Sequence, residues 1–121
     1  MLSHRVIGAR AALLTCGVMI VTAAVPAPAR AGTAARRVPD AVWDQVADCE
    51  SDGDWAADTG NGFYGGLQIG PSTWASAGGL RYARRPDRAS RRQQIDVAQE
   101  ILRRQGWRAW PGCARALGLL S

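Results

Sequence analysis

Residues 49–74 read CESDGDWAADTGNGFYGGLQIGPSTW, and this stretch decides the fold. It begins where an expected helix over residues 41–49 ends, because Val42, Val46 and Cys49 recur there at helical spacing. Its middle, residues 53–70, is too rich in Gly, Asp and Asn to continue that helix. A turn signal at 59–62, with short apolar pieces near it, predicts a small β-hairpin or sheet. Pro at residue 71 then starts a second helix.

A third helix is expected further along the chain. Residues 90–93, SRRQ, form a capping box, in which the Ser and Gln side chains bond the backbone of the first turn. Ile95, Ala98 and Leu102 give the helix an apolar face, and Gly106 supplies its end. The sequence therefore predicts an α+β fold, mainly helical, with a short β-hairpin or sheet.

The N-terminal residues have the features of a secretory signal peptide. Residues 1–10 carry two Arg, residues 11–25 are uncharged and mostly apolar, and Ala29-Arg30-Ala31 fits an A-x-A cleavage site. A membrane anchor is the alternative, but an apolar run of about 15 residues is shorter than a spanning helix needs. We expect a signal peptide over 1–31, a short flexible leader over 32–39 and one secreted domain over 40–121, with no stable membrane anchor.

Cleavage near residue 31 removes Cys16 and leaves Cys49 and Cys113. An even pair of cysteines in an exported protein predicts a disulfide. The bridge closes a loop of 65 residues (113 − 49 + 1), for which the chain-entropy relation gives about 4.3 kcal/mol. We therefore expect the disulfide to supply a large share of the stability of so small a domain.

Charge is distributed unevenly along the chain. The net charge of +5 falls to +2 after residue 31, where 12 Arg face 10 acids. Residues 40–58 hold seven acids and no base, whereas residues 81–115 hold ten Arg and three acids. An Arg-rich face is also typical of nucleic-acid binding, but export argues against that function, and we expect no nucleic-acid partner.

The side chains present exclude several kinds of catalytic site. The only His, His4, leaves with the signal peptide, so neither a Ser-His-Asp nor a Cys-His site is available. Four aspartates offer oxygen ligands to calcium, but their spacing fits no EF-hand loop. We expect no metal and no cofactor, which leaves carboxylate acid–base chemistry.

Glu50 is the candidate general acid. It lies where the first helix ends, and the C-terminal end of a helix dipole disfavours an anion. Neighbouring aspartates and an apolar wall of Trp43 and Trp55 would raise its pKa further. An ordinary surface Glu is the alternative. Trp74, Phe63 and Tyr64 border the Gly-rich stretch, where aromatic rings suit the apolar faces of sugars.

A family resemblance rests on four ordered runs: WDQVADCES at 43–51, TGNGFYGGLQ at 59–68, PSTW at 71–74 and RQGWRAWPGC at 104–113. With shorter pieces around 88–95, they resemble the resuscitation-promoting factor domain of actinobacteria. The resemblance implies a compact lysozyme-like fold with one disulfide, Cys49–Cys113. It also implies a secreted, cell-wall-associated muralytic enzyme that cleaves the β-1,4 bond between N-acetylmuramic acid and N-acetylglucosamine and promotes regrowth of dormant cells.

The family's residues map onto this sequence position by position. Its catalytic Glu corresponds to Glu50, and its substrate-binding positions correspond to Gln68, Thr73, Trp74, Asn61 and Tyr64. Peptidoglycan glycan strands are the implied partner of a monomer, with a peptidoglycan endopeptidase as a further partner.

Two departures from the family pattern affect the site. Asp52 and Asp54 stand where the family commonly has Gly and Asn, so two possible assisting carboxylates flank the acid. Phe63 stands where Tyr is common. The bond is broken either by attack of the muramoyl 6-hydroxyl or by water, and the sequence leaves both routes open. A non-catalytic glycan-binding or signalling module with the same fold is the alternative function.

Overall fold

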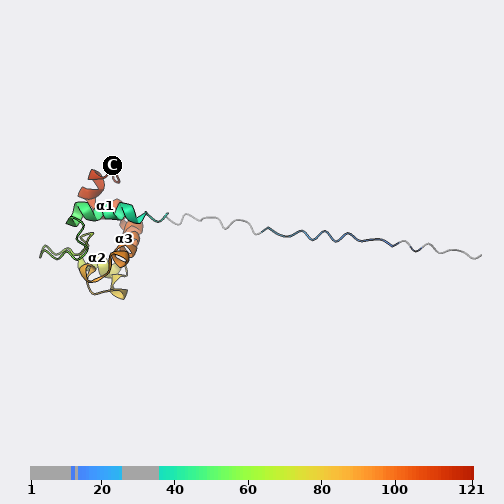
Figure 1. Ribbon diagram of the computed structural model, residues 1–121, viewed down its shortest axis with the longest axis horizontal. Helices are drawn as coiled ribbons and strands as arrows, with labels where there is room; N and C mark the ends of the chain where they lie inside the picture. Colours follow the sequence, from blue (N-terminus) through green and yellow to red (C-terminus); the bar gives the residue numbers. More distant parts are fainter. Residues whose placement is uncertain (1–11, 13, 26–35) are drawn as a thin grey trace, which may run out of the picture. The chain divides into compact units, whose positions relative to one another are not determined.

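The computed structural model describes residues 12, 14–25 and 36–121 (Figure 1). The chain divides into two units, Met1–Gly32 and Thr33–Ser121. In the first unit the described residues are exposed and form neither helix nor strand. The expected cleavage site at 29–31 and the first half of the expected leader, residues 32–35, lie outside the described residues. Within the described residues, no helix combines the length and the apolar character that crossing a membrane requires.

Four α-helices form the framework of the second unit: α1 (Asp40–Ser51), α2 (Pro71–Ser76), α3 (Arg91–Gln105) and α4 (Pro111–Ala116). Three short 3-10 helices connect them: η1 (Gly79–Arg81), η2 (Pro86–Arg88) and η3 (Gly106–Ala109). Pro71 begins α2 as expected, because a proline at the first helical position gives up no helical hydrogen bond.

The ends of α3 follow the sequence signals. Ser90 accepts a hydrogen bond from the backbone N–H of Gln93, and the Gln93 side chain accepts one from the backbone N–H of Ser90. The predicted capping box is therefore present. Gly106 ends the helix with φ of +67°, a backbone conformation that glycine adopts without steric cost.

The core gathers three tryptophans between α1 and the C-terminal elements. The ring of Trp43, fully buried on α1, lies 5.1 Å from those of Trp107 and Trp110. Beside them, the predicted disulfide between Cys49 and Cys113 joins α1 to α4, with its Cα atoms 5.8 Å apart. The disulfide prediction is confirmed.

Residues 53–70 do not form the expected β-hairpin. In the described part of the chain there is no strand, only isolated antiparallel bridges that pair Tyr64 with Asp58 and with Ile69. The reason is local: positive φ at Gly60, Gly62 and Gly65 interrupts every run long enough to form a ladder. In Figure 1 the turn at the middle of this segment, in lime green, projects from the body of the domain.

In place of strand pairing, hydrogen bonds from one buried side chain hold this segment. Gln94, on α3, is completely buried, and its Nε2 donates to the carbonyls of Trp55 at 2.7 Å and Ala89 at 3.0 Å. Its Oε1 accepts from the backbone N–H of Gly66 at 3.0 Å. Gln94 therefore attaches the irregular segment to the longest helix from both sides.

Acidic α1 and basic α3 face each other, which explains much of the charge asymmetry. Arg91 donates two hydrogen bonds of 2.8 Å to Asp44, and Arg92 lies 3.0 Å from Asp40. The chain entering α1 is also attached, since the backbone of Val38 exchanges two hydrogen bonds with the side chain of Gln99. The last part of the predicted leader is thus held against α3.

Candidate active site

Glu50 lies in the last turn of α1, where it is partly buried. Burial raises the pKa of its carboxyl group above the ordinary value of 4.5, because a desolvated carboxylate is disfavoured. The sequence predicted this direction, and of the three causes it offered, desolvation is the one that the structure supports. A carboxyl group with a raised pKa is suited to donate a proton near neutral pH.

The end of α1 is built by residues 51–53. Asp52 adopts the left-handed conformation with φ of 53°, and Gly53 follows with φ of 75°. The backbone N–H of Gly53 then bonds the carbonyl of Ala47, which satisfies a carbonyl at the helix end. The positive φ favours glycine at residue 53, and a Cβ there would also meet the Asp48 carboxylate at 2.8 Å.

Ser51 connects this helix end to the Gly-rich segment. Its single hydroxyl proton has two carbonyl acceptors in reach, that of Gly66 at 2.8 Å and that of Ala47, within α1, at 3.0 Å. Gly66 lies two residues before Gln68 in the chain. The residue next to Glu50 is therefore bonded to the segment that forms the wall of a small cavity.

That cavity, of about 70 Å³, is formed by the Gly-rich segment, α2, α3 and η3. It is lined by Phe63, Gln68, Ile69, Gly70, Thr73, Ile101, Gln105, Ala109 and Trp110. Its wall thus brings together two of the predicted substrate-binding residues, Gln68 and Thr73.

Asn61 belongs to the same surface. Its Nδ2 donates to Oε1 of Gln68 at 3.0 Å, and its Oδ1 accepts from the backbone N–H of Phe63. Gln68 has a positive φ of 53° and donates from Nε2 to the carbonyl of Gly65. A non-glycine residue in this conformation carries backbone strain, which often marks a functional position. Both amide side chains are held in fixed orientations.

Two predicted binding residues lie elsewhere. Trp74 has no exposed surface, and its indole N–H donates to the carbonyl of Ala83 at 2.8 Å, so its side chain lies in the core, and contact with substrate stays a prediction. Sequence alone could not distinguish a core Trp from a cleft Trp, because both occur beside loops. Tyr64 is not in the cavity wall; its ring lies 4.4 Å from the guanidinium of Arg85, which also pairs with Asp58 and Asp87.

The two candidate assisting carboxylates, Asp52 and Asp54, are exposed. Asp52 stands at the C-cap of α1. Oδ1 of Asp54 accepts from the backbone N–H of Ala56 at 2.9 Å and so stabilises its own turn. No group of three or more metal-ligating side chains occurs within the described residues.

Sequence reasoning missed part of the cavity wall. Phe63, with 51% of its surface exposed, lies at the cavity; the sequence indicated it as an aromatic ring suited to sugars but not as one of the substrate-binding residues. Gln105 and Ala109 were not considered. A signal for Gln105 was available, since it follows Ile101 by four residues and so shares its face of α3.

Comparison with known proteins places the chain in a family. The transglycosylase-like domain family matches residues 38–113. Resuscitation-promoting factor RpfD of Mycobacterium tuberculosis is 47% identical over 109 residues, which cover 87% of this chain and 69% of that protein. RpfC of the same species is 57% identical over 81 residues, covering 67% and 56% respectively.

A resuscitation-promoting factor of Corynebacterium glutamicum is 53% identical over 87 residues, which cover 72% of this chain and 45% of that protein. The chain thus spans about half the length of the C. glutamicum relative and of RpfC. The matches include the end of α1, the Gly-rich segment and α3, which together build the site. The chain belongs to the resuscitation-promoting factor family and contains its transglycosylase-like domain.

Proposed function

We propose that this protein cleaves peptidoglycan at the β-1,4 bond between N-acetylmuramic acid and N-acetylglucosamine, with Glu50 as the general acid, and that it promotes regrowth of dormant cells. The observation that carries the catalytic part is the raised pKa of Glu50, a partly buried carboxyl at the end of α1 whose neighbour Ser51 is bonded to Gly66. The names of the relatives, all resuscitation-promoting factors, support the biological part.

In the proposed mechanism, protonated Glu50 donates its proton to the glycosidic oxygen. Positive charge then develops at C1 of the muramic acid, as in an oxocarbenium ion. Gln68, Thr73 and Asn61 lie where they can bind sugar hydroxyl or acetamido groups, since their side chains line or adjoin one small cavity. Phe63 adds an exposed ring that suits the apolar face of a sugar.

In the second step we propose, the bond from C1 to the N-acetylglucosamine oxygen has broken, the muramoyl 6-hydroxyl attacks C1, and its proton passes to the Glu50 carboxylate, which gives a 1,6-anhydro product and restores the acid. Two observations favour this route over hydrolysis. The matching family is transglycosylase-like, and both candidate carboxylates, Asp52 and Asp54, are exposed to solvent rather than held in the cavity wall. An inverting hydrolase needs a second carboxylate to activate water.

We further propose that residues 1–31 are a signal peptide and that the secreted domain acts at the cell wall as a monomer. Residues 40–121 would then form the catalytic domain, entered through the leader at 32–39. The domain depends on Cys49–Cys113, which forms in an oxidising compartment, and this agrees with export.

The test is mass spectrometry of fragments released from purified actinobacterial peptidoglycan by the oxidised mature protein. We expect fragments with an anhydro muramic terminus from wild type, and a rate at least about a hundredfold lower with Glu50→Gln, because general acid catalysis is lost. Asp48→Asn, also near the end of α1 but exposed, is the matched control and should retain activity.

Equal release by wild type and Glu50→Gln would exclude Glu50 as the acid. No release by wild type, together with an unimpaired biological effect of Glu50→Gln on dormant cells, would favour a glycan-binding or signalling module. If wild type releases fragments with reducing termini instead of anhydro termini, and Asp54→Asn abolishes this release, the second step is hydrolysis and not attack by the 6-hydroxyl.

A further inference from the structure

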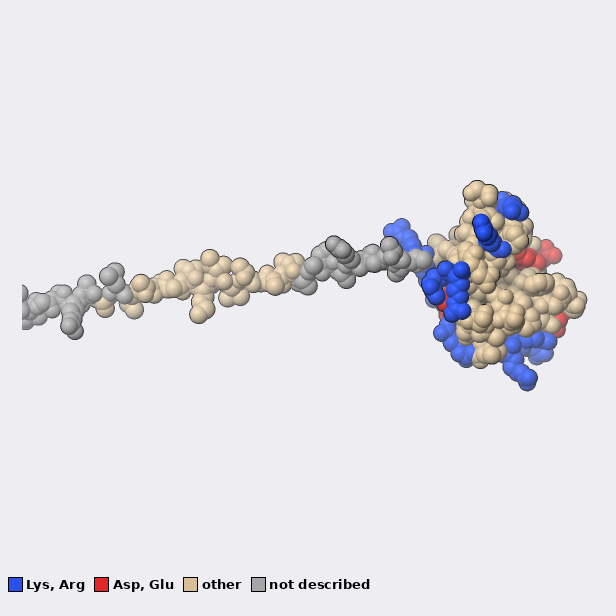
Figure 2. All heavy atoms as spheres, turned by 180° about the vertical axis from the view of Figure 1, so that it is seen from behind, with Lys and Arg blue, Asp and Glu red and all other residues tan. Residues whose placement is uncertain are grey.

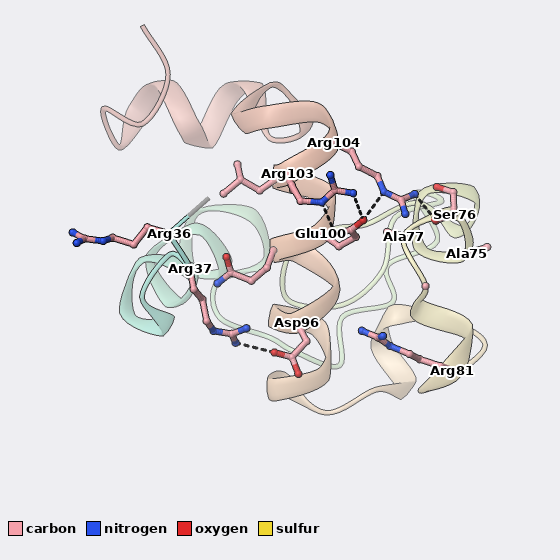
Figure 3. A pocket seen from close by; sticks show the side chains of 13 residues that line it. Arg36, Arg37, Ala75, Ser76, Ala77, Arg81, Asp96, Glu100, Arg103 and Arg104 are labelled. Carbon is pink, nitrogen blue, oxygen red and sulfur yellow. Dashed lines mark hydrogen bonds and ion pairs between the residues drawn. The ribbon is translucent and has the colours of Figure 1, made fainter. Parts of the chain in front are cut away.

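A groove of about 740 Å³, far larger than the cavity near Gln68, lies between α2, η1 and one face of α3 (Figure 3). Five arginines line it, against the two acids Asp96 and Glu100: Arg36, Arg37, Arg81, Arg103 and Arg104. These seven side chains therefore carry a net charge of +3. On the face of the domain in Figure 2, basic groups (blue) also outnumber acidic ones (red).

Both acids of the groove are already paired with arginines. Glu100 accepts hydrogen bonds from both Arg103 at 2.8 Å and Arg104 at 2.7 Å, and these bonds lower its pKa to about 2. Asp96 lies 2.8 Å from Arg37. Arg104 also donates to the carbonyl of Ser76 at the end of α2, at 2.6 Å. Glu100 therefore stays ionised across the physiological pH range, and its negative charge is already paired with two of the arginines of the groove.

Arg81 supplies a cation that no described carboxylate neutralises. It is exposed, and its guanidinium carbon lies 4.7 Å from the ring centroid of Tyr82. In Figure 3 its guanidinium points across the groove toward α3. A planar guanidinium presented in this way matches a carboxylate with two parallel hydrogen bonds.

The groove and the cavity share two walls. On α2, Thr73 lines the cavity, whereas Ser76 lines the groove one turn later. On α3, Gln105 lines the cavity and its neighbour Arg104 lines the groove. A polymer bound in the cavity would therefore place its side branches near the groove. In peptidoglycan those branches are stem peptides, which carry free carboxylates.

We propose that this groove is a binding site for the carboxylate-bearing stem peptide of the glycan strand, with Arg81 as the principal anchor. The inference rests on peptidoglycan as the proposed substrate. The site selects strands that carry acidic peptides over bare glycan, and it does so through charge rather than through an apolar pocket. Arg103 and Arg104 add to the field while they remain bonded to Glu100.

The binding test uses the oxidised mature protein and the synthetic tripeptide L-alanyl-γ-D-glutamyl-meso-diaminopimelic acid, titrated by NMR. We expect chemical-shift changes at α2, η1 and α3. The dissociation constant should be about tenfold higher for Arg81→Gln, because the loss of one charge-assisted hydrogen bond weakens binding by about that factor. Arg115→Gln removes the same charge from an exposed position on α4, outside the groove, and should bind the peptide as wild type does.

Two comparisons separate this site from general attraction of anions. The tripeptide with its carboxylates amidated should bind much more weakly, and inorganic phosphate at the same charge concentration should not displace the acidic peptide. Equal binding of the amidated peptide, or equal losses in Arg81→Gln and Arg115→Gln, would overturn the proposal. Displacement by phosphate alone would reassign the groove to phosphate-bearing polymers.

A kinetic comparison distinguishes failure of this site from failure of the proposed activity. On peptidoglycan with its stem peptides, Arg81→Gln should raise KM and leave kcat unchanged. On glycan strands stripped of peptides by an amidase, it should change neither. If the protein binds the peptide but cleaves neither polymer, the binding site stands and the proposed activity fails. If it cleaves both polymers with no dependence on Arg81, the activity stands and the binding site fails.

Discussion

Burial opposes the charge of Glu50 and raises its pKa above 4.5. An unfolded chain releases this proton near that ordinary value, whereas the folded chain holds it to a higher pH. Between the two pKa values the folded state binds more protons, so the contribution of Glu50 to the free energy of unfolding falls as the pH rises through this window. Ionised Glu50 therefore destabilises the fold in the pH range where the proposed mechanism requires it to be protonated.

Glu50→Gln removes this titration and supplies a first prediction about stability. We expect the variant to gain Tm relative to wild type as the pH rises from about 4 to about 7. At about pH 4 both the folded and the unfolded pKa values exceed the pH, so Glu50 of the wild type is uncharged like the Gln that replaces it. Calorimetry at a series of pH values measures the difference. A Tm difference that stays constant across that range would contradict the raised pKa.

Gln94 is the buried polar side chain that holds the site segment in place. Its three hydrogen bonds reach Trp55, Ala89 and Gly66, and Gly66 in turn accepts from Ser51 beside Glu50. A chain of bonds thus runs from α3 to the proposed acid. A Cβ at Gly65 would also collide with the Gln94 amide, which explains the glycine at that position.

Replacing Gln94 by Leu should lower the free energy of unfolding by about 2–4 kcal/mol, because the buried N–H of Gly66 and two carbonyls lose their partner. Urea denaturation measures the change. The control is Gln45→Leu on the exposed face of α1, which should change stability by less than about 0.5 kcal/mol. Similar losses for both variants would refute the role given to Gln94.

At the scale of elements, α3 is the helix to which the other parts attach. Val38 before α1 bonds to Gln99, the acids of α1 pair with Arg91 and Arg92, and Gln94 holds the Gly-rich segment. The ion pairs with α1 are largely exposed, and such pairs contribute little in water. The start of α3 is therefore stabilised mainly by its capping box and by burial of Ile95, Val97 and Ala98.

The capping box yields a prediction for this helix. Ser90→Ala leaves the backbone N–H of Gln93 without its acceptor and should lower the free energy of unfolding by about 1 kcal/mol. Ser72→Ala, at an exposed position near the start of α2, is the matched control. Thermal unfolding followed by circular dichroism compares the two. A smaller loss for Ser90→Ala than for Ser72→Ala would indicate that the cap does not stabilise α3.

At the scale of the whole domain, one covalent link joins the two ends of the fold. Cys49 lies on α1 beside Glu50, and Cys113 lies on α4, 64 residues away in sequence. The bridge limits the unfolded ensemble and also ties the proposed acid to the C-terminal elements that carry Trp107 and Trp110.

Reduction of this disulfide should lower the free energy of unfolding by roughly 4 kcal/mol, a large part of the total for a domain of this size. Paired urea titrations of the oxidised protein and of the Cys49→Ala/Cys113→Ala variant measure the loss. We expect peptidoglycan cleavage by the variant to fail at a lower temperature than cleavage by the oxidised protein. A difference below about 1 kcal/mol would mean that the core alone holds the fold.

Sequence by itself determined the features that depend on neighbours in the chain. The starts of α2 and α3, the end of α3 at Gly106 and the capping box were predicted, because caps, prolines and glycines act within one helical turn. The disulfide followed from the count of cysteines in an exported chain. Glu50 emerged because few other catalytic side chains were present.

Only the tertiary structure decided what is buried, what pairs across the fold and where charge remains free. Gly66 lies against α3 because Gln94, far away in the sequence, accepts a hydrogen bond from its backbone N–H. Trp74 is core because Ala83 accepts from its indole N–H, and Arg81 stays without a described carboxylate while other arginines find one. Burial and long-range pairing depend on residues far apart in sequence, whose proximity no local pattern encodes.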